Sequence, residues 1–505
     1  MFKPSVYQQN IFNFVTNGKG SAVVSAVAGS GKTTTIVECA KLLPNKEILF
    51  LAFNKEIVTT LSQKLNAPNI TCSTTHSFGF KAITKALKTK VRVDNYKWRN
   101  YINTNAISLS DMISEDMEDS ILRNFLFNIH DLFNMCRINL VNGSDIDKIN
   151  KIALHHNIDI IADEINIVST LLDMAYNINL GDSVDFIDMI VLPSTQFSKY
   201  VGKFDMVFVD ECQDLNTAQR ELLKLALKPY SGRFIAVGDP KQAINGFAGA
   251  TNNSFDLLKE LANNNELPLS VNYRCGKNII AQAKEFVPHI TAFENSDMGK
   301  VTNTDNFNDL KNGDMILCRT SAPLIRLCLR MFANGMAAKV KGKDLGKNLI
   351  SLIDKLNPKN INSLFKKLDD EIEKLAKKLE TLNVQNIDDS TPMLVLKDKI
   401  DCLEAFAEKA NSIREMKSLI EFTFSDDNMK NAIMLSTVHK SKGLENDRVF
   451  IILPEKLPLK WKGQQDWEYE QELNLKYVAI TRAKKELVWV NLDKDQLAKY
   501  DFSKI

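Results

Sequence analysis

The stretch that decides the fold is VVSAVAGSGKTTTIVECA, residues 23–40. It begins with a run of small and apolar residues, which predicts a buried strand. A glycine-rich turn at residues 29–31 follows, and Lys32 and Thr33 then open an apolar pattern with helical spacing. Strand, turn and helix in this order are the context of a Walker A phosphate-binding loop, although Ala26 occupies the place of its first glycine.

The residue types of this loop suit a nucleoside triphosphate. Small residues let backbone N–H groups approach phosphate oxygens, and the start of a helix adds partial positive charge. We expect Lys32 to reach the β- and γ-phosphates of the nucleotide and the Thr33 hydroxyl to ligate Mg²⁺. The residues expected to bind the nucleotide here are Ala28, Gly29, Ser30, Gly31, Lys32, Thr33 and Thr34. A chance Gly-Lys-Thr turn is the alternative, and the loop alone does not distinguish a kinase from a motor.

Composition narrows the class of protein. A chain of 505 residues predicts three or four structural units, at roughly 100–200 residues each. It has no run of 18 apolar residues and no signal-peptide core at its start, so we expect no membrane span and a cytoplasmic location. Eight cysteines without a C-x-x-C pair fit a reducing compartment. Because the net charge is only +2, nucleic-acid binding would need a local basic groove.

Two further strand ends supply polar groups for the same site. Residues 204–216, FDMVFVDECQDLN, end an apolar run in Asp210 and Glu211. At the carboxyl end of a parallel strand, Asp210 would hold Mg²⁺ and Glu211 would orient or deprotonate the attacking water. Residues 233–247, RFIAVGDPKQAINGF, place Gln242 where an amide could sense the γ-phosphate. An exposed acidic turn and an ordinary Gly-Asp-Pro turn are the respective alternatives.

Six segments, taken together, resemble the motifs of a superfamily 1 DNA helicase of the UvrD/Rep/PcrA type. In chain order they are AVAGSGKTTT, VFVDECQDLN, AVGDPKQAINGFAGA, LPLSVNYRC, STVHKSKGLENDRVFI and YVAITRAKKEL. The resemblance runs from about residue 7 to about residue 489, so it covers nearly the whole chain. It implies ATP as the nucleotide, Mg²⁺ as its metal ion, and single-stranded DNA with ss/ds junctions as the substrate.

The resemblance also implies roles for residues at matching positions. Gln8, or with less support Gln9, would read the adenine edge, Tyr273 would stack on the adenine and Glu445 would contact the sugar. Arg274 and Arg482 would be two arginine fingers that meet charge developing on the γ-phosphate. The positions that match DNA-contacting ones are Phe53, Asn54, Lys55, Thr75, His76, Phe247, Thr437 and His439. From pattern alone, core packing of Phe53, a polar strand end at His439 and a surface position of Arg482 remain alternatives.

The chain departs from the family pattern at two places. Asn245, Phe247 and Ala248 stand where the family has a tyrosine, a large aromatic residue and an arginine. We expect a weaker grip on DNA there, by about 1–3 kcal/mol for the missing stack. After GLE the family places Phe or Trp, whereas this chain has Asn446.

The predicted fold is α/β, with two RecA-like parallel-sheet cores that each carry a mainly helical insertion. The expected ranges are 1–85 and 198–262 for the first core, 86–197 for its insertion 1B, 263–345 and 426–505 for the second core, and 346–425 for a short insertion 2B. In the first insertion, Asp185 and Asp188 are expected to be structural. In the second, leucines and an isoleucine from Leu364 to Leu382 step by three and four, which favours an intramolecular helical hairpin over a partner-binding coiled coil.

The sequence therefore predicts an ATP-dependent DNA helicase that moves on single-stranded DNA, with 3′→5′ polarity implied by the resemblance. A motor that strips proteins from DNA, or serves a larger complex without unwinding, is the alternative. A small-molecule kinase and a helicase–nuclease fusion are disfavoured, the second because few residues follow Arg482. Protein partners, oligomeric state, biological pathway and the acceptance of RNA stay open.

Overall fold

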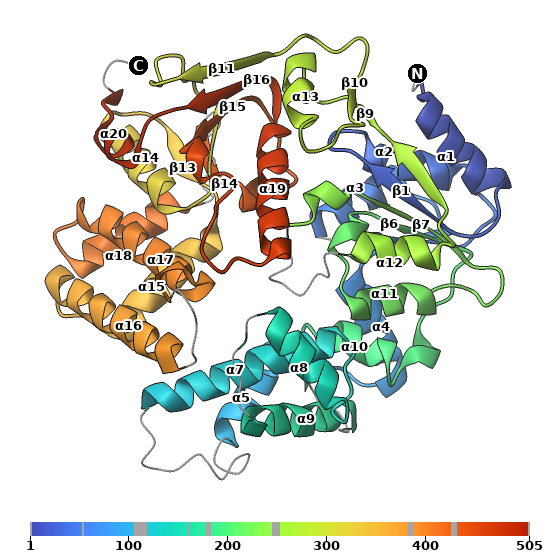
Figure 1. The fold of residues 1–505 in the computed structure, drawn as a ribbon. Helices are drawn as coiled ribbons and strands as arrows, with labels where there is room; N and C mark the ends of the chain where they lie inside the picture. Colours follow the sequence, from blue (N-terminus) through green and yellow to red (C-terminus); the bar gives the residue numbers. More distant parts are fainter. Residues whose placement is uncertain are drawn as a thin grey trace. The chain divides into compact units, whose positions relative to one another are not determined.

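The chain divides into two units, each described by itself. The computed structural model describes residues 3–52, 55–105, 119–156, 158, 162–177, 183–244, 253–381, 387–425 and 432–502. The first unit comprises Met1–Val27 and Gly31–Ser270, and the second comprises Val271–Ile505 together with Ala28–Ser30. The predicted α/β class is confirmed, because each unit contains a six-stranded parallel sheet (Figure 1).

The sheet of the first unit has the strand order β3-β2-β6-β7-β1-β8. Its strands are β1 (Ala22–Ala26), β2 (Ile48–Ala52), β3 (Ile70–Thr74), β6 (Met206–Val209), β7 (Arg233–Gly238) and β8 (Glu266–Leu269), all paired in parallel. Parallel sheets are covered by helices on both faces, which explains why β2 is buried along its whole length. At the centre, the rings of Phe50 and Phe208 stack with centroids 4.9 Å apart. Since all these strands run the same way, the loops after β1, β6 and β7 share one edge of the sheet.

Helices cover both faces of this sheet. One face packs against α1 (Val6–Asn17), α2 (Lys32–Lys41) and α3 (Lys55–Lys64), through residues such as Ile11, Ile36 and Leu61. The other packs against α4 (Thr75–Leu87), α11 (Thr217–Leu225) and α12 (Ser254–Leu261). The Thr74 hydroxyl caps α4 by accepting a hydrogen bond from Ser77 N–H. Among the described helices, none has the length and apolar character that a membrane crossing requires.

Helices also occupy the range expected for the first insertion. They are α5 (Lys97–Thr104), α7 (Asp119–Ile138), α8 (Ile146–His155), α9 (Ala162–Asn177) and α10 (Asp188–Ser194). A two-stranded parallel pair, β4 (Arg92–Val93) with β5 (Ser183–Val184), brackets α5–α9 in the sequence, and α10 follows it.

A buried ionic cluster ties these helices together. Arg137 of α7 is only 1% exposed and donates to both carboxylate oxygens of Asp185, at 2.8 and 2.9 Å, and to Asp188 Oδ1 at 2.5 Å. The Lys97 ammonium lies 3.0 Å from Asp188. A buried charge must be compensated by partners of this kind. The expectation that Asp185 and Asp188 are structural is therefore confirmed.

The sheet of the second unit has the order β11-β16-β15-β12-β14-β13, again with every pair parallel. Its strands are β11 (Lys300–Thr304), β12 (Met315–Cys318), β13 (Ala338–Val340), β14 (Ile433–Thr437), β15 (Asn446–Ile452) and β16 (Ala483–Val490). Helices α13 (Lys277–Ala283) and α19 (Asp466–Ile480) both contact β16 and each other. Helices α14 (Ala322–Ala333) and α20 (Lys494–Lys499) also belong to this core.

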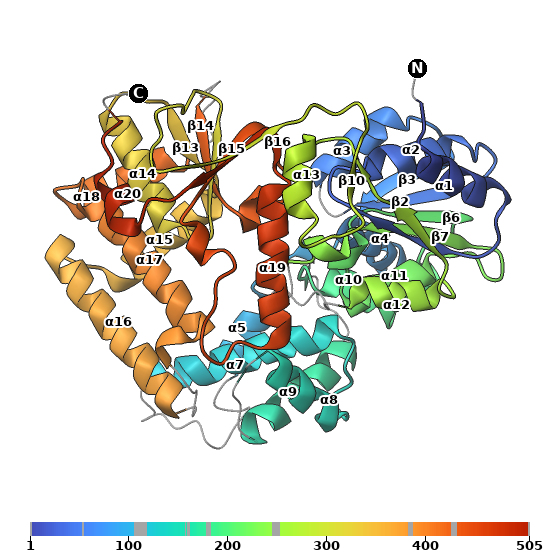
Figure 2. The same ribbon diagram turned by 45° about the horizontal axis from the view of Figure 1, so that its top comes forward.

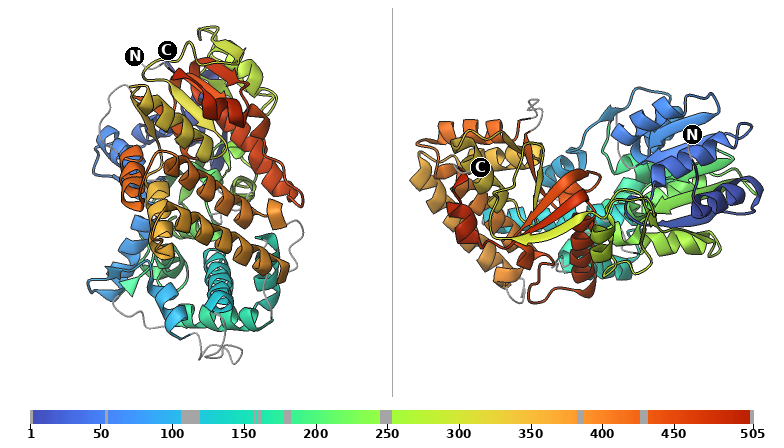
Figure 3. Two further views of the ribbon diagram at one scale, coloured as in Figure 1. Left: turned by 90° about the vertical axis from the view of Figure 1, so that its left-hand side faces the viewer. Right: turned by 90° about the horizontal axis from the view of Figure 1, so that it is seen from above.

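The second insertion is built into this unit. It consists of α15 (Lys343–Leu356), α16 (Ile361–Thr381), α17 (Thr391–Ala407) and α18 (Ile413–Thr423), with α16 and α17 side by side (Figure 2, Figure 3). Leu364 and Leu368 of α16 are fully buried in one hydrophobic cluster with core residues such as Ile316 of β12. This confirms the intramolecular hairpin, while Leu382 lies outside the described residues. Since one cluster joins insertion and sheet, the helices form a layer of the second core.

Polar contacts fix the same layer. The Asp398 carboxylate of α17 accepts hydrogen bonds from the N–H groups of Ser321 and Ala322, at 3.1 and 3.3 Å, and so caps α14. Arg326 of α14 pairs with Glu404 and Glu408 of α17.

We predict that this layer and the second sheet unfold as one cooperative unit. Phe406 of α17 is fully buried in the shared cluster, so Phe406→Ala should cost about 3–5 kcal/mol. Hydrogen exchange should accelerate in β12 and β14 as well as in α17. Val395→Ala, at an exposed position of the same helix, is the control and should leave exchange unchanged. Faster exchange confined to α15–α18 would contradict the shared core.

Candidate nucleotide and DNA sites

The loop after β1 meets the end of β6 within the first unit. The Thr33 hydroxyl donates a hydrogen bond to Asp210 Oδ2 at 2.8 Å, and Lys32 Nζ lies 3.4 Å from Glu211 Oε1. Asp210 is buried, and its burial, followed by the neighbouring charge of Glu211, raises the pKa of its carboxyl group to about 6. Four residues that the sequence predicted to act together thus lie together, with two oxygen groups of the kind that Mg²⁺ prefers.

A network of amides extends this group to β7. Gln213 Nε2 donates to Glu211 Oε2 at 2.6 Å, and Gln213 Oε1 accepts from Asp239 N–H at 3.1 Å. Gln242 Nε2 then donates to Asp239 Oδ2 at 2.9 Å. A Cβ at Gly238 would lie 2.5 Å from Gln213 Oε1, so this close approach requires glycine. Gln213 therefore couples Glu211 to Gln242.

Sequence reasoning missed Gln213. Its signal was its place two residues after Glu211, inside the quoted DECQD segment. The backbone of Glu211 itself is left-handed, with φ of 53°, a conformation that costs a non-glycine residue about 1–3 kcal/mol and that clusters at functional sites.

Gln8, predicted to read the adenine, has its amide engaged inside the first unit. Its Oε1 accepts from Ser5 N–H at 3.0 Å in the capping box of α1, and its Nε2 donates to Thr35 Oγ1 at 3.1 Å. Gln8 thereby joins α1 to the helix that follows the phosphate loop.

Ala28–Ser30 belong by their contacts to the second unit. Asn272 Nδ2 donates to Ala28 O at 2.6 Å, and Ala28 N–H donates to the Tyr477 hydroxyl at 2.9 Å. Gly29 has φ of 63°, and a Cβ there would lie 2.7 Å from Arg274 Cβ. Glycine is needed at this position both for its conformation and for its space. Tyr477 is fully buried, and its hydroxyl accepts the hydrogen bond from the backbone of this loop.

Both predicted arginine fingers have partners within the second unit. Arg274 Nε lies 2.5 Å from Glu445 Oε2, and Lys484 Nζ lies 3.0 Å from the other oxygen of that carboxylate. Although partial burial opposes it, Lys484 and Arg274 hold the pKa of Glu445 below its usual value. Arg482 is 1% exposed and donates to Val478 O, Leu444 O and Thr481 Oγ1, so the surface alternative for Arg482 is wrong.

Tyr273 is one of the exposed aromatic residues of the second unit. Its side chain is 39% exposed, and its ring lies 5.1 Å from that of Phe293. Asn446, a departure from the family pattern, donates through Nδ2 to Gly313 O at 2.8 Å and through N–H to Arg482 O at 2.9 Å. These two hydrogen bonds hold Asn446 in place as the first residue of β15.

The predicted DNA-contacting residues of the first unit fall into distinct environments. Thr75 is 5% exposed, and its hydroxyl accepts from Gln219 Nε2 at 3.0 Å, so it is part of the core. His76 lies at the surface edge, where its ring meets that of Phe186 at 5.7 Å in an edge-on contact. Burial lowers the pKa of His76. Phe186 is 51% exposed and is a candidate contact that the sequence motifs do not include, because only the fold brings it to His76.

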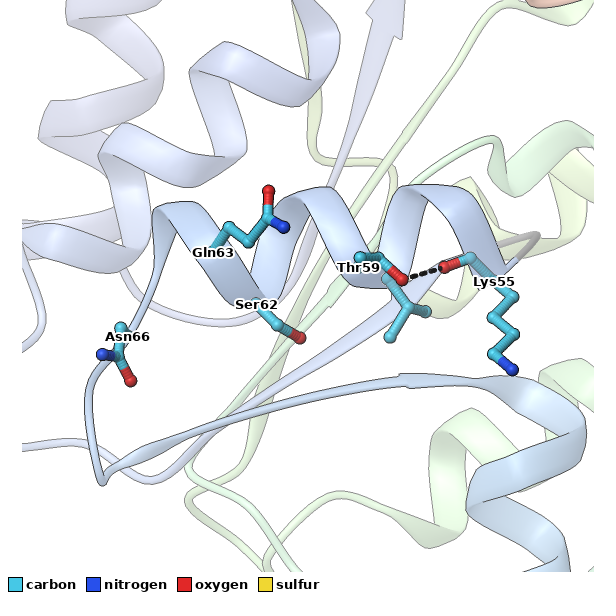
Figure 4. A pocket seen from close by; sticks show the side chains of 6 residues that line it. Lys55, Thr59, Ser62, Gln63 and Asn66 are labelled. Carbon is cyan, nitrogen blue, oxygen red and sulfur yellow. Dashed lines mark hydrogen bonds between the residues drawn. The ribbon is translucent and has the colours of Figure 1, made fainter.

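Lys55 opens α3 beside a hollow of about 550 Å³ (Figure 4). The helix lines it with Val58, Thr59, Ser62 and Gln63, and Asn66 follows beyond the end of α3. The Thr59 hydroxyl donates to Lys55 O at 3.0 Å. Phe53 and Asn54, which precede Lys55, lie outside the described residues, as do Phe247 and its neighbours Asn245 and Ala248. Their roles remain predictions.

In the second unit, Thr437 is the last residue of β14, and His439 lies two residues beyond it. The Thr437 hydroxyl accepts from Lys440 N–H at 3.4 Å. Burial, and then the charge of Arg319, lowers the pKa of His439 to about 3. His439 is therefore neutral near pH 7 and would meet a DNA backbone as a hydrogen-bonding group.

Two α/β units, each with a parallel sheet and one with a phosphate loop beside a buried aspartate and a half-buried glutamate, define a P-loop nucleotide hydrolase with a second RecA-like core. Comparison with known proteins gives the particular family. Residues 7–263 match the UvrD/REP helicase N-terminal domain, and residues 347–493 match the UvrD-like helicase C-terminal domain. The chain belongs to the UvrD/REP family of DNA helicases, which couple ATP hydrolysis to DNA unwinding, as its motifs predicted.

Several relatives support this assignment. A probable DNA helicase II homolog of Mycoplasma genitalium is 26% identical over 607 residues, covering 93% of this chain and 82% of that protein. F-box DNA helicase 1 of Gallus gallus is 24% identical and covers 95% of this chain and 48% of that protein. The ATP-dependent DNA helicase PcrA of Staphylococcus aureus is 24% identical, over 61% of this chain and 58% of that protein.

We predict that Gln213→Ala lowers the turnover number for ATP by about 10- to 100-fold, because a misplaced catalytic group can cost about 10²-fold. The KM for ATP should stay near its wild-type value, since Gln213 bonds Glu211 and Asp239 and none of the loop residues. Steady-state ATPase measurements provide the check, with Gln282→Ala on the exposed face of α13 as the control. An unchanged turnover number would show that Gln213 does not position Glu211.

Proposed function

We propose that this DNA helicase moves along single-stranded DNA in the 3′→5′ direction and opens duplex at ss/ds junctions. One ATP with Mg²⁺ is bound by residues of both cores. The observation that carries the proposal is the group of Lys32, Thr33, Asp210 and Glu211 at one edge of the first sheet. Its donor chemistry fits a magnesium-bound triphosphate.

In the first core, each residue of this group has a separate task. Lys32 compensates phosphate charge, and Asp210 and Thr33 supply oxygen ligands to Mg²⁺. When bound, Mg²⁺ neutralises charge on the phosphates. Glu211, held by Gln213, orients the attacking water and accepts its proton. Gln242 reports the state of the γ-phosphate through Asp239 and Gln213.

The second core supplies two guanidinium groups. Arg274 leaves Glu445 to bind the phosphate, which is favourable because a phosphate offers it more charge than one carboxylate. Arg482 is held near the start of β15 and β16 by backbone carbonyls and stabilises developing charge. Sharing of one anion by two cores makes their separation depend on hydrolysis, a hinge-type switch.

DNA lies along the residues at the ends of the strands. Lys55, His76 and Phe186 contribute from the first core, and Thr437 and His439 from the second, together with Phe53, Asn54 and Phe247. Aromatic stacking tolerates any base, as a translocating motor requires. Opening one base-pair step costs only about 0.6–2.2 kcal/mol, so single-base steps are energetically feasible. The proposed location is the cytoplasm, which suits eight free thiols.

We predict that Lys32→Ala abolishes DNA-stimulated ATPase activity and that Arg482→Ala lowers its turnover about 10³-fold or more, as expected for an arginine finger. Because Arg482 is buried, melting temperatures and a second variant, Arg482→Lys, separate loss of chemistry from loss of folding. The control is Lys41→Ala, at the exposed end of the same helix as Lys32, and it should keep wild-type activity. Near wild-type turnover in a folded Arg482→Ala protein would refute the finger role.

A second prediction concerns polarity. A duplex with a 3′ single-stranded tail should be unwound, and a duplex with a 5′ tail should not. Because α15–α18 pack into the second core, a motor that translocates and strips proteins without unwinding is the competing candidate. Release of a tightly bound protein from the 3′-tailed strand, without strand separation, would favour that candidate. Unwinding from the 5′ tail would contradict the proposed direction.

A further inference from the structure

The second unit carries a hollow of about 550 Å³ that no nucleotide or DNA contact described above uses. Its walls are the end of α13, the segment after β15 and one face of α19. Tyr469, Leu473 and Lys476 form the α19 face, since they are spaced by four and three residues along the helix. Phe286, in the turn that follows α13, also lines the hollow.

Cations and aromatic rings alternate around this hollow. Lys460 Nζ lies 5.0 Å from the ring centroid of Tyr469, and Lys476 Nζ lies 5.9 Å from that of Phe286. Lys456 adds a third ammonium group, and Glu285 and Glu455 are the acidic residues of the lining. In the part of the chain that the structure describes, none of the three lysines forms an ion pair. Aromatic faces flanked by cations are the combination that binds unpaired nucleic-acid strands.

The fold places this hollow at the same edge of the second sheet as Thr437 and His439, which are proposed above to contact DNA. Strands β12, β14 and β15 are parallel neighbours, so their carboxyl ends share one edge. Arg319, directly after β12, makes two hydrogen bonds through Nε and one through Nη2 to the carboxylate of Glu472. The same carboxylate accepts from Leu459 N–H at 3.0 Å. One buried carboxylate thus anchors the wall of the hollow to the edge that bears Thr437 and His439.

We propose that the hollow binds a segment of single-stranded nucleic acid, with phosphates at Lys460 and Lys476 and a base on the ring of Tyr469. An acidic peptide would also neutralise the lysines, but it would leave the ring faces unused and would meet Glu285 and Glu455. The proposal rests on the proposed function, because the strand must already cross this edge of the second core. The hollow would be a further contact for the same DNA strand, formed by residues outside the helicase motifs.

The test is the salt dependence of binding. Fluorescence anisotropy with a labelled oligothymidylate gives the dissociation constant between roughly 50 and 200 mM salt, and each phosphate contact on a single strand contributes about 0.7 to the slope of log K against log salt. Lys460→Gln/Lys476→Gln should lower that slope by about 1.4. Lys460→Arg/Lys476→Arg keeps both charges and should retain the wild-type slope. Lys311→Gln/Lys339→Gln, near the amino ends of β12 and β13, is the matched control and should also retain it.

A second pair of variants tests the stacked base. Tyr469→Leu should weaken binding about tenfold with the salt slope unchanged, and Tyr469→Phe should bind like the wild type. A wild-type slope in the double glutamine variant would overturn the proposal. The proposal would also be overturned if a polyglutamate peptide bound the wild type but not the double glutamine variant, while both proteins bound DNA equally well. Failure of the wild-type protein to bind any oligonucleotide would overturn the proposed function as well, and the two failures are therefore distinguishable.

Discussion

The structure of the first core depends on one buried carboxylate. Asp210 is removed from water at the end of β6, where burial raises its pKa to about 6, and the Thr33 hydroxyl is its hydrogen-bond donor from the start of α2. The strand order places β7 between β6 and β1, so the loop with Asp239 and Gln242 follows a strand that neighbours both β6 and β1. This order explains why Gln213 can bond to Glu211 on one side and to Asp239 on the other. The residues proposed to orient the attacking water and to sense the γ-phosphate are thereby joined in one hydrogen-bonded network.

The second core has a different constraint, which is to hold two guanidinium groups without a phosphate loop of its own. Arg274 is paired with Glu445, and Arg482 is held by backbone carbonyls and by the hydroxyl of Thr481. Both depend on the packing of α19 and β16, and α15–α18 join the same core through one hydrophobic cluster. A rigid second core would transmit a small change at the phosphate to the strand ends that bear Thr437 and His439.

The sequence predicted those features that local chemistry determines. The phosphate loop, the acidic strand end and the helical hairpin of α16 and α17 follow from residue type and spacing, and the structure contains all three. It did not predict that Thr75 would turn into the core, because only the fold shows that Gln219 of α11 reaches its hydroxyl. For the same reason, Phe186 and Gln213 escaped notice, since their roles come from neighbours 110 and 26 residues away, His76 and Asp239. The Glu445 pair with Arg274 likewise joins segments that are distant in sequence.

The central claim is that one ATP is shared by residues of two cores and that its hydrolysis lets them separate. It can be tested with one spectroscopic label on each unit, at Tyr230→Cys and Met298→Cys, both of which replace highly exposed residues. Cys72 is the one half-buried cysteine and is first changed to serine, since the other seven are buried. In the presence of single-stranded DNA, the distance between the labels should differ between a non-hydrolysable ATP analogue and ADP, and Arg274→Ala should abolish the difference. An identical distance with both nucleotides, in a protein that hydrolyses ATP normally, would contradict the account.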